Sequence, residues 1–203
     1  MSRPIAGPAH GVYSDAMLQL PPTTVLLPID MQQAFDDPAF PRRCNPNCDR
    51  NGLALLAAWR ERGMPIIHVR HDSVEPGSKL RPHAPGNGFR PGFGPRGDEP
   101  LVTKSVNASF IGTDLDLRLR RLGATAVVAF GITTDQCVST TVRVGSNLGW
   151  RMIVAGDACS CFDMPGLDGT VIPAETVQAV HLATLAAEFA TVASTDAIIG
   201  ALG

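Results

Sequence analysis

Cys137 is the residue whose type and position most directly suggest chemistry. It lies in the segment 131–145, after an apolar run over 125–132 and before a helix-compatible run over 138–148. A thiol at such a strand-to-helix junction lies beside backbone N–H groups that have no partner within the helix, and the helix dipole favours negative charge there. We therefore expect a thiolate nucleophile, with the same N–H groups forming an oxyanion hole. A buried, inert cysteine is the alternative for this position taken alone.

Two further side chains could complete a nucleophilic site with Cys137. Asp30 ends the apolar run 23–30, and Lys104 ends the run 101–104. The carboxylate can take the thiol proton and later return it to a leaving amine, while the ammonium stabilises the thiolate and positions the carboxylate. The expected reaction is attack on a carbonyl, a thioester intermediate and release of the acid by water. Taken singly, Asp30 could be a buried cap and Lys104 an edge lysine, but their joint placement at strand ends favours catalysis.

The elements that must position these residues follow an α/β pattern. The expected strands are residues 23–30, 65–71, 101–104, 125–132, 150–155 and 191–194, and the expected helices are 49–62, 113–122, 138–148 and 174–190. Such alternation predicts one three-layer α/β/α domain with a six-stranded, mostly parallel, Rossmann-like sheet. Ligands of such sheets bind at the carboxyl ends of the strands. Pro28 is unfavourable in a central strand because it has no N–H group to donate to the neighbouring strand.

The composition narrows the class of protein. A chain of 203 residues with 44% hydrophobic residues predicts a single domain over 1–203, with an N-terminal extension over 1–22. A net charge of −2 gives no basic face for nucleic acid or an anionic membrane. No apolar run is long enough to span a bilayer, and the N-terminus lacks the apolar stretch of a secretory signal, so we expect a cytoplasmic protein.

The other cysteines and the glycines give no cofactor motif. The chain has five cysteines, an odd number that does not suggest a disulfide framework. Cys44 and Cys48 have a spacing that invites a metal site, but Cys159 and Cys161 do not complete it, so we expect Cys44 and Cys48 to be loop or helix-start thiols. Cys159 and Cys161 are expected to be inert, with oxidation near the site as the alternative. No glycine-rich phosphate loop follows a strand, which argues against a nucleotide cofactor.

Three motifs resemble the isochorismatase-like cysteine hydrolase family, on its amidohydrolase branch. They are LLPIDMQQAF at 26–35, VTKSVNASFIGTDL at 102–115 and GITTDQCV at 131–138, and the resemblance extends over 23–199. It implies the fold described above and a catalytic triad of Asp30, Lys104 and Cys137. It also implies a cis peptide bond between Ile132 and Thr133, which would direct the Thr133 N–H toward an oxyanion beside the Cys137 N–H. A homodimer or homotetramer is the assembly that the resemblance implies.

Two branches of the family are less suitable. Isochorismatases that cleave a vinyl ether lack the nucleophilic cysteine, so Cys137 argues against that activity. Nicotinamidases carry a metal set of Asp and His. Here His68 and His71 are three residues apart in a strand and face opposite sides, so they cannot readily bind one ion together. We expect no metal and no other cofactor, with His71 as a pocket wall or hydrogen-bond donor.

Substrate contacts are the least determined part of the site. Phe35, Phe110 and Ile132 lie in the motifs and are candidates for contact with a planar amide, although core packing explains the aromatic residues nearly as well. Basic residues in or just before the loop 72–99 could bind a substrate carboxylate, with a solvated loop face as the alternative. Lys79, Arg81, Arg90 and Arg96 lie in the loop, and Arg70 precedes it. His181 lies on a helix with an expected buried stripe, so we expect a structural role.

These residues favour a cofactor-independent cysteine hydrolase that cleaves a C–N bond of a small amide or ureide. Its substrate specificity would come from the loops 72–99 and 163–174. A metal-assisted, nicotinamidase-like amidase is the alternative within the class. Two alternatives are not hydrolases. One is a thiol protein used in redox sensing, and the other is a catalytically inactive homologue that acts as an oligomeric binding module.

Overall fold

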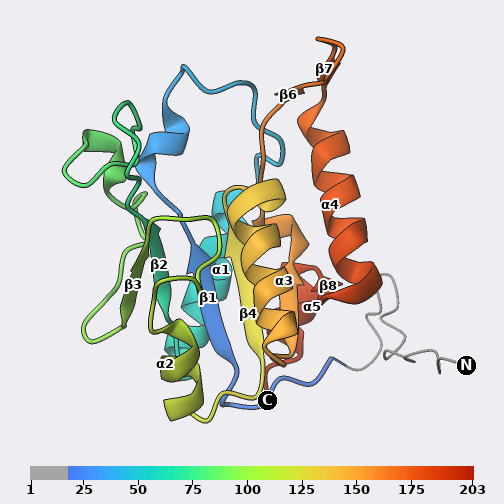
Figure 1. The fold of residues 1–203 in the computed structure, drawn as a ribbon. Helices are drawn as coiled ribbons and strands as arrows, with labels where there is room; N and C mark the ends of the chain where they lie inside the picture. The colour runs from blue at the N-terminus through green and yellow to red at the C-terminus, as the bar shows by residue number, and fades with distance from the viewer. Residues whose placement is uncertain (1–17) are drawn as a thin grey trace, which may run out of the picture.

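The six principal strands form one parallel sheet in this computed structural model, which describes residues 18–203 (Figure 1). The strands are β1 (Val25–Ile29), β2 (His68–His71), β3 (Leu101–Lys104), β4 (Val127–Gly131), β5 (Met152–Ala155) and β8 (Thr191–Ala193). Their order in the sheet is β3-β2-β1-β4-β5-β8, and every neighbouring pair is parallel. The predicted α/β class and six-stranded sheet are confirmed.

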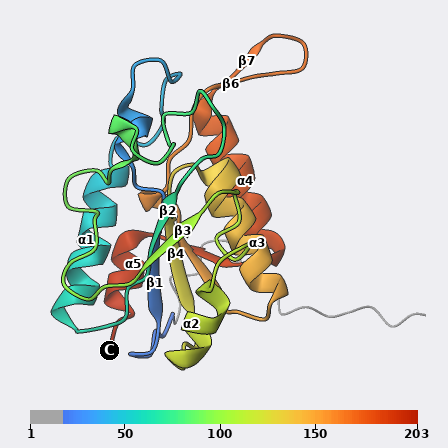
Figure 2. The same ribbon diagram turned by 60° about the vertical axis from the view of Figure 1, so that its left-hand side comes forward.

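Helices cover both faces of this sheet. They are α1 (Cys48–Glu61), α2 (Leu115–Arg121), α3 (Ser139–Asn147), α4 (Ala174–Glu188) and α5 (Thr195–Gly200). Figure 2 shows α1 and α5 on one face and α2, α3 and α4 on the other. Every residue of β1 and β4 is buried between these layers, as expected for central strands of a parallel sheet. The sequence did not predict α5, whose first turn is capped by the Ser194 hydroxyl accepting from the Ala197 N–H.

Pro28 lies inside β1, a central strand, and interrupts the hydrogen bonding to β2. The N–H groups of Leu26 and Asp30 donate to the carbonyls of Pro65 and Val69, both at 3.0 Å. Pro28 lies between them and has no N–H to donate. The expected strand 65–71 is therefore regular only from His68 onward.

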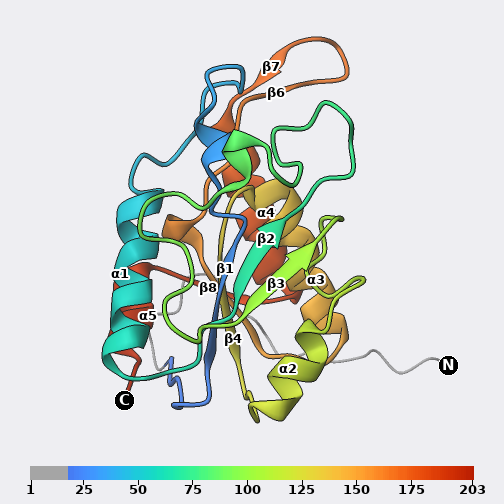
Figure 3. The ribbon, with the colours of Figure 1, turned by 90° about the vertical axis from the view of Figure 1, so that its left-hand side faces the viewer.

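The strands all run toward one end of the molecule, where the long loops gather. The segment 161–173, expected to be an irregular loop, forms an antiparallel hairpin of β6 (Met164–Pro165) and β7 (Val171–Ile172). Figure 3 shows this hairpin projecting from that end, on the same side as the loop after β2. Both predicted specificity loops thus lie at the carboxyl edge of the sheet.

The first described residues meet the C-terminal segment at the opposite edge. Within the predicted extension 1–22, residues 1–17 lie outside the described residues, but Leu20 is buried and its N–H donates to the Ala201 carbonyl at 3.1 Å. Residues 18–22 therefore belong to the folded domain. Between residues 18 and 203, no helix is both long enough and apolar enough to cross a membrane.

Candidate active site

The three predicted catalytic residues come from three strand ends around the point where the strand order reverses. Asp30 follows β1, Lys104 ends β3 and Cys137 lies in a π-helical turn, Thr134–Val138, after β4. Strands β1 and β4 approach closely here, because a Cβ atom at Gly131 would lie 2.0 Å from the Ile29 carbonyl oxygen. Gly131 also has a φ of +147°, which glycine adopts without steric cost. The fold thus brings Asp30 and Cys137 together at its switch point.

Lys104 is the centre of the cluster. Its Nζ lies 2.6 Å from Asp30 Oδ2 and 3.4 Å from Cys137 Sγ. It also lies 3.0 Å from His71 Nδ1. The Asp30 and Lys104 side chains are fully buried, so their attraction is little screened by water. One ammonium group therefore contacts a carboxylate, a thiol and an imidazole.

Burial changes the expected state of Cys137. Desolvation raises the pKa of the Cys137 thiol well above its ordinary value, and the nearby Asp30 carboxylate raises it further, whereas Lys104 lowers it less. This direction opposes the expected resting thiolate, because the sulfur lies in a buried site rather than at an exposed first turn. A thiol in such a site must lose its proton during the reaction.

Asp30 has a carboxylate oxygen free to accept that proton. Oδ2 pairs with Lys104, but Oδ1 is buried and has no hydrogen-bond partner among the described residues. The residue has a φ of +52°, a left-handed conformation that Asp adopts more readily than most residues. The carboxylate and the sulfur belong to a set of ligand atoms that all lie within 4.8 Å of one another.

Two hydrogen bonds between the Gln32 side chain and the His71 backbone hold His71 in place. The Gln32 side chain accepts a hydrogen bond from the His71 N–H at 2.9 Å and donates to its carbonyl at 3.0 Å. Gln32 also donates to the Asn87 carbonyl at 2.9 Å, which connects the loop after β2 to the site. Burial, followed by the charge of Lys104, lowers the pKa of His71, so the imidazole is neutral at physiological pH. His71 can then accept a hydrogen bond from Lys104.

The backbone beside Cys137 contains the cis peptide bond that the resemblance implied, between Ile132 and Thr133. Thr133 and Cys137 both line the pocket described below. The next N–H along the chain, that of Thr134, is already bonded to the Ser160 carbonyl at 3.0 Å, so Thr134 is not free to bind an oxyanion.

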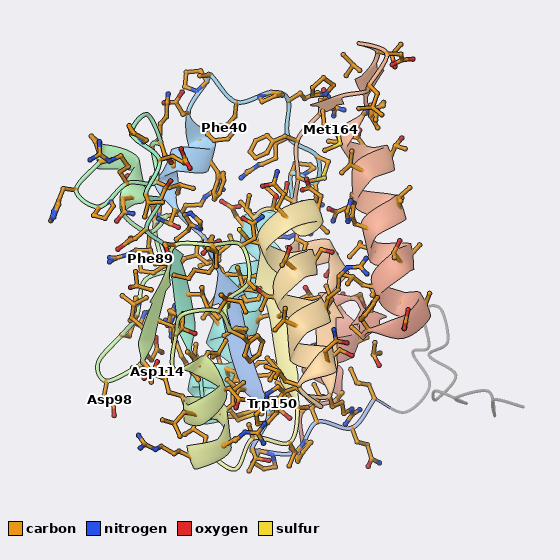
Figure 4. The ribbon with its side chains drawn as sticks, viewed as in Figure 1. Phe40, Phe89, Asp98, Asp114, Trp150 and Met164 are labelled. Atoms are coloured by element: carbon orange, nitrogen blue, oxygen red, sulfur yellow. The ribbon has the colours of Figure 1, made fainter. Side chains whose placement is uncertain are left out.

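A pocket of about 320 Å³ opens onto Cys137. Its lining comprises Phe35, Phe40, Pro41, His71, Leu80, Asn107, Thr133, Asp135, Gln136, Cys137, Phe162, Asp163 and Met164. Phe40 stacks on Phe162 with ring centroids 5.0 Å apart, and Phe35 lies 5.6 Å from Phe40. Figure 4 shows Phe40 and Met164 at the carboxyl end of the sheet, above the strands. These rings form an aromatic wall, defined here as Phe35, Phe40 and Phe162.

Two predicted substrate contacts do not line this pocket. Phe110 packs against α3, where a Cβ atom at Gly145 would lie 3.0 Å from its ring, and Ile132 is fully buried in the main core. Both residues belong to motifs around the site, but their side chains are buried in the main hydrophobic core. Phe35 and His71 do line the pocket.

The basic loop residues do not reach the pocket either. Lys79 pairs with Asp37, Arg70 with Asp72 and Arg90 with Asp36 and Asp49. None of the five basic residues singled out between 70 and 96 is among the lining residues. The predicted binding of a substrate carboxylate by this loop is therefore not supported. His181 is also absent from the lining. The sequence predicts Val180 in the buried stripe of the same helix, but Val180 is 58% exposed, so the stripe is narrower than predicted.

Asp30, His71 and Cys137 offer ligand atoms that could hold a metal ion. Lys104 Nζ already lies within 3.4 Å of an atom of each of them. An ion at that place would have to displace a buried ammonium group from its carboxylate. His68 faces away, as predicted, with its Nε2 2.8 Å from Glu99.

Four residues of the site were missed by reasoning from the sequence. Gln32 and Asn87 position the loop, and Phe40 and Phe162 build the aromatic wall. Only Gln32 carried a signal, because it lies two residues after Asp30. The two rings come from segments that are distant in the sequence and meet only in the folded chain.

Comparison with known proteins agrees with this geometry. The family model for the isochorismatase domain matches residues 24–197. The isochorismatase family protein YrdC of Bacillus subtilis (strain 168) is 39% identical over 174 residues, which are 86% of this chain and 93% of YrdC. A solved structure of an isochorismatase family protein from Chromobacterium violaceum ATCC 12472 has a TM-score of 0.88 and 42% identity, covering 92% of this chain and 97% of that one. A streptothricin hydrolase of Streptomyces noursei is 32% identical over 142 residues, 69% of this chain and 50% of that enzyme.

The chain is a hydrolase with an α/β fold, since members of the matched family are hydrolases. The chain belongs to the isochorismatase family.

Proposed function

We propose that this hydrolase cleaves the C–N bond of a small amide or ureide through a thioester on Cys137. The observation that carries the proposal is the contact of one buried ammonium group, Lys104 Nζ, with both Asp30 and Cys137, at 2.6 and 3.4 Å. Burying an ion pair costs desolvation energy, and well-packed apolar residues would often stabilise the fold at least as well. A buried ion pair beside a thiol suits a reaction in which a proton and a charge must move.

In the first step, the Cys137 sulfur attacks the amide carbonyl while its proton passes to Asp30. The unpartnered Oδ1 of Asp30 is the acceptor that the geometry favours. Asp30 then donates this proton to the departing amine, and the C–N bond breaks to leave a thioester. Water, activated by the same carboxylate, hydrolyses the thioester and regenerates the thiol.

Lys104 and the backbone stabilise the charges that develop. As the thiol ionises, its charge forms 3.4 Å from the Lys104 ammonium. The negative charge on the carbonyl oxygen would be bound by the N–H groups of Thr133 and Cys137. Removal of one such donor typically costs about 10²–10³ in kcat.

The pocket also favours a class of substrate. The aromatic wall suits a planar, apolar group, and 320 Å³ is at the lower end of the range for small-molecule sites. The acidic lining residues are Asp135 and Asp163, of which Asp163 is paired with Arg42 at 2.8 Å. No lysine or arginine is among the lining residues of the described chain. We propose an uncharged or cationic amide rather than one carrying a carboxylate.

A metal-assisted mechanism is the alternative that a specific observation supports, namely the ligand set of Asp30, His71 and Cys137. It would require the Lys104 ammonium to leave that set. The two mechanisms therefore differ in their response to a chelator.

The test is ammonia release from a panel of small amides and ureides by wild type and Cys137→Ala, with and without EDTA. Benzamide and 4-carboxybenzamide form a matched pair for the effect of a carboxylate. We expect release that is lost in the variant, unaffected by EDTA and faster for the uncharged member of the pair. Release that survives in Cys137→Ala would overturn the thioester mechanism, and release abolished by EDTA would favour the metal-assisted one.

A further inference from the structure

Cys44 and Cys161 form a close pair outside the catalytic cluster. Cys44 lies in the segment before α1 and Cys161 in the segment between β5 and β6, and their Sγ atoms are 3.7 Å apart. Their neighbours in sequence, Cys48 and Cys159, are not their partners: the Cys48 thiol donates to the Ala158 carbonyl at 3.1 Å. The spacing of the cysteines in the sequence does not show this pairing.

The backbones of the two residues are already joined. The Cys44 N–H donates to the Cys161 carbonyl at 3.0 Å, and the Cys161 N–H donates to the Cys44 sulfur at 3.4 Å. A disulfide has an S–S distance of about 2.05 Å, so only a small contraction between two adjacent segments is needed. The Cys44 side of the pair is 3% exposed and Cys161 is fully buried, which limits access to small reagents.

We propose that Cys44 and Cys161 are a redox-active dithiol that a hydroperoxide converts into a disulfide. This site is separate from the hydrolytic one and does not depend on the proposed hydrolysis. The named oxidant is small and uncharged, as the burial of the pair requires.

The reaction balances in two steps. The Cys44 thiolate attacks one oxygen of hydrogen peroxide, the O–O bond breaks, and the hydroxide released takes a proton to become water. Cys44 is then a sulfenic acid. The Cys161 sulfur attacks the Cys44 sulfur and gives up its proton, and the S–O bond breaks to release a second water. Two thiols lose two electrons in total, and one peroxide gains them.

The surroundings make Cys44 a better peroxide nucleophile than Cys137. Hydrogen bonds from Cys161, from its side chain first and then its N–H, lower the pKa of Cys44 although burial opposes them. Burial raises the pKa of Cys137, Cys48 and Cys159. Because the thiolate is the reactive form, the pair should be oxidised before the catalytic thiol.

The pair also lies behind the wall of the substrate pocket. Phe162 follows Cys161 directly, and the Arg43–Phe162 bridge joins the same two segments. A disulfide between residues 44 and 161 would close a long loop and so stabilise the folded state. We expect the midpoint of thermal unfolding to rise by about 5–15 °C.

The experiment treats wild-type protein with one equivalent of hydrogen peroxide, blocks the remaining thiols and maps the peptides by mass spectrometry without reduction. The expected product is a crosslink between the peptides of Cys44 and Cys161, with loss of two hydrogen atoms from the intact mass, an unmodified Cys137 and full reversal by dithiothreitol. Cys48→Ala is the matched control, which should retain the crosslink. Cys161→Ala should instead accumulate oxygen on Cys44.

Three results would overturn the proposal. They are oxidation of Cys137 ahead of the pair, irreversible oxidation of Cys44 without a crosslink in wild type, and no reaction of either thiol with peroxide. Because the map is made on wild-type protein, the conclusion does not depend on the folding of any variant.

Discussion

Lys104 and Asp30 form an ion pair of 2.6 Å in which neither side chain is exposed to solvent. The two residues come from different strands, β3 and β1, with β2 between them. Lys104 must therefore extend across the end of β2 to reach Asp30, which brings it past His71. This reach explains why one ammonium group contacts three functional side chains.

Removing one member of this pair should destabilise the protein strongly. Asp30→Ala leaves the Lys104 charge buried without a partner, which typically costs about 3–5 kcal/mol. The measurement is urea unfolding of Asp30→Ala beside Asp98→Ala, an exposed carboxylate whose loss should change the free energy of unfolding by less than about 0.5 kcal/mol. An equally small effect of Asp30→Ala would show that the pair is not buried as described.

Cys137 should react slowly with an alkylating reagent at neutral pH. Burial and the Asp30 carboxylate raise its pKa, so the thiolate fraction increases with pH without reaching a plateau near neutrality. The rate of carbamidomethylation of the Cys137 peptide, measured from pH 6 to 10, should rise throughout that range. A plateau that begins below pH 8 would indicate a resting thiolate paired with Lys104 and would contradict the proton transfer to Asp30.

Loss of a ring from the aromatic wall should weaken substrate binding more than turnover. Phe162 stacks on Phe40, and both rings line the pocket. We expect Phe162→Leu to raise KM for a planar amide by about 2–10-fold, with a smaller change in kcat. Steady-state kinetics check this, with the exposed Val74→Ala as control. A fall in kcat at unchanged KM would assign the ring to the chemical step.

Glu99 should make stability fall with pH in acid. Burial raises the pKa of Glu99, but hydrogen bonds from Arg60, from the Arg96 N–H and from His68 together lower it to about 2 from an ordinary value of 4.5. The folded state therefore binds fewer protons than the unfolded state between these values. The contribution is fully present above pH 4.5 and is lost as the pH falls toward 2.

Thermal unfolding of wild type and Glu99→Gln between pH 3 and 7 measures this contribution. The difference in stability between the two proteins should shrink steadily below pH 4.5. A difference that stays constant over that range would contradict the lowered pKa.

The parts of the site that could be predicted from the sequence are those determined by strand ends. Asp30, Lys104 and Cys137 each follow an apolar run, and a parallel sheet brings the ends of such runs to one edge. This rule was enough to expect all three in one crevice, although the order of the strands was not predicted. Their roles rest on geometry and chemistry and stay predictions.

Features that depend on contacts between distant segments could not be predicted in this way. The Phe40–Phe162 stack and the Cys44–Cys161 pair each join residues more than 100 positions apart. The protonated state of Cys137 was missed because burial, which only the folded chain defines, outweighs the effect of a helix start. Phe110 and Ile132 do not line the pocket, and a motif gives the position of a residue in the chain but not whether its side chain is buried in the core.

The most direct test of the account is the search for an acyl group on Cys137 during turnover. Wild-type protein is mixed with an amide that it hydrolyses, quenched in acid within milliseconds to seconds, digested and analysed by mass spectrometry. The account predicts a Cys137 peptide heavier by the acyl part of the substrate, which decays at the rate of turnover and is discharged by hydroxylamine. Hydrolysis at an undiminished rate in Cys137→Ala, with no acyl group on the wild-type peptide, would contradict it.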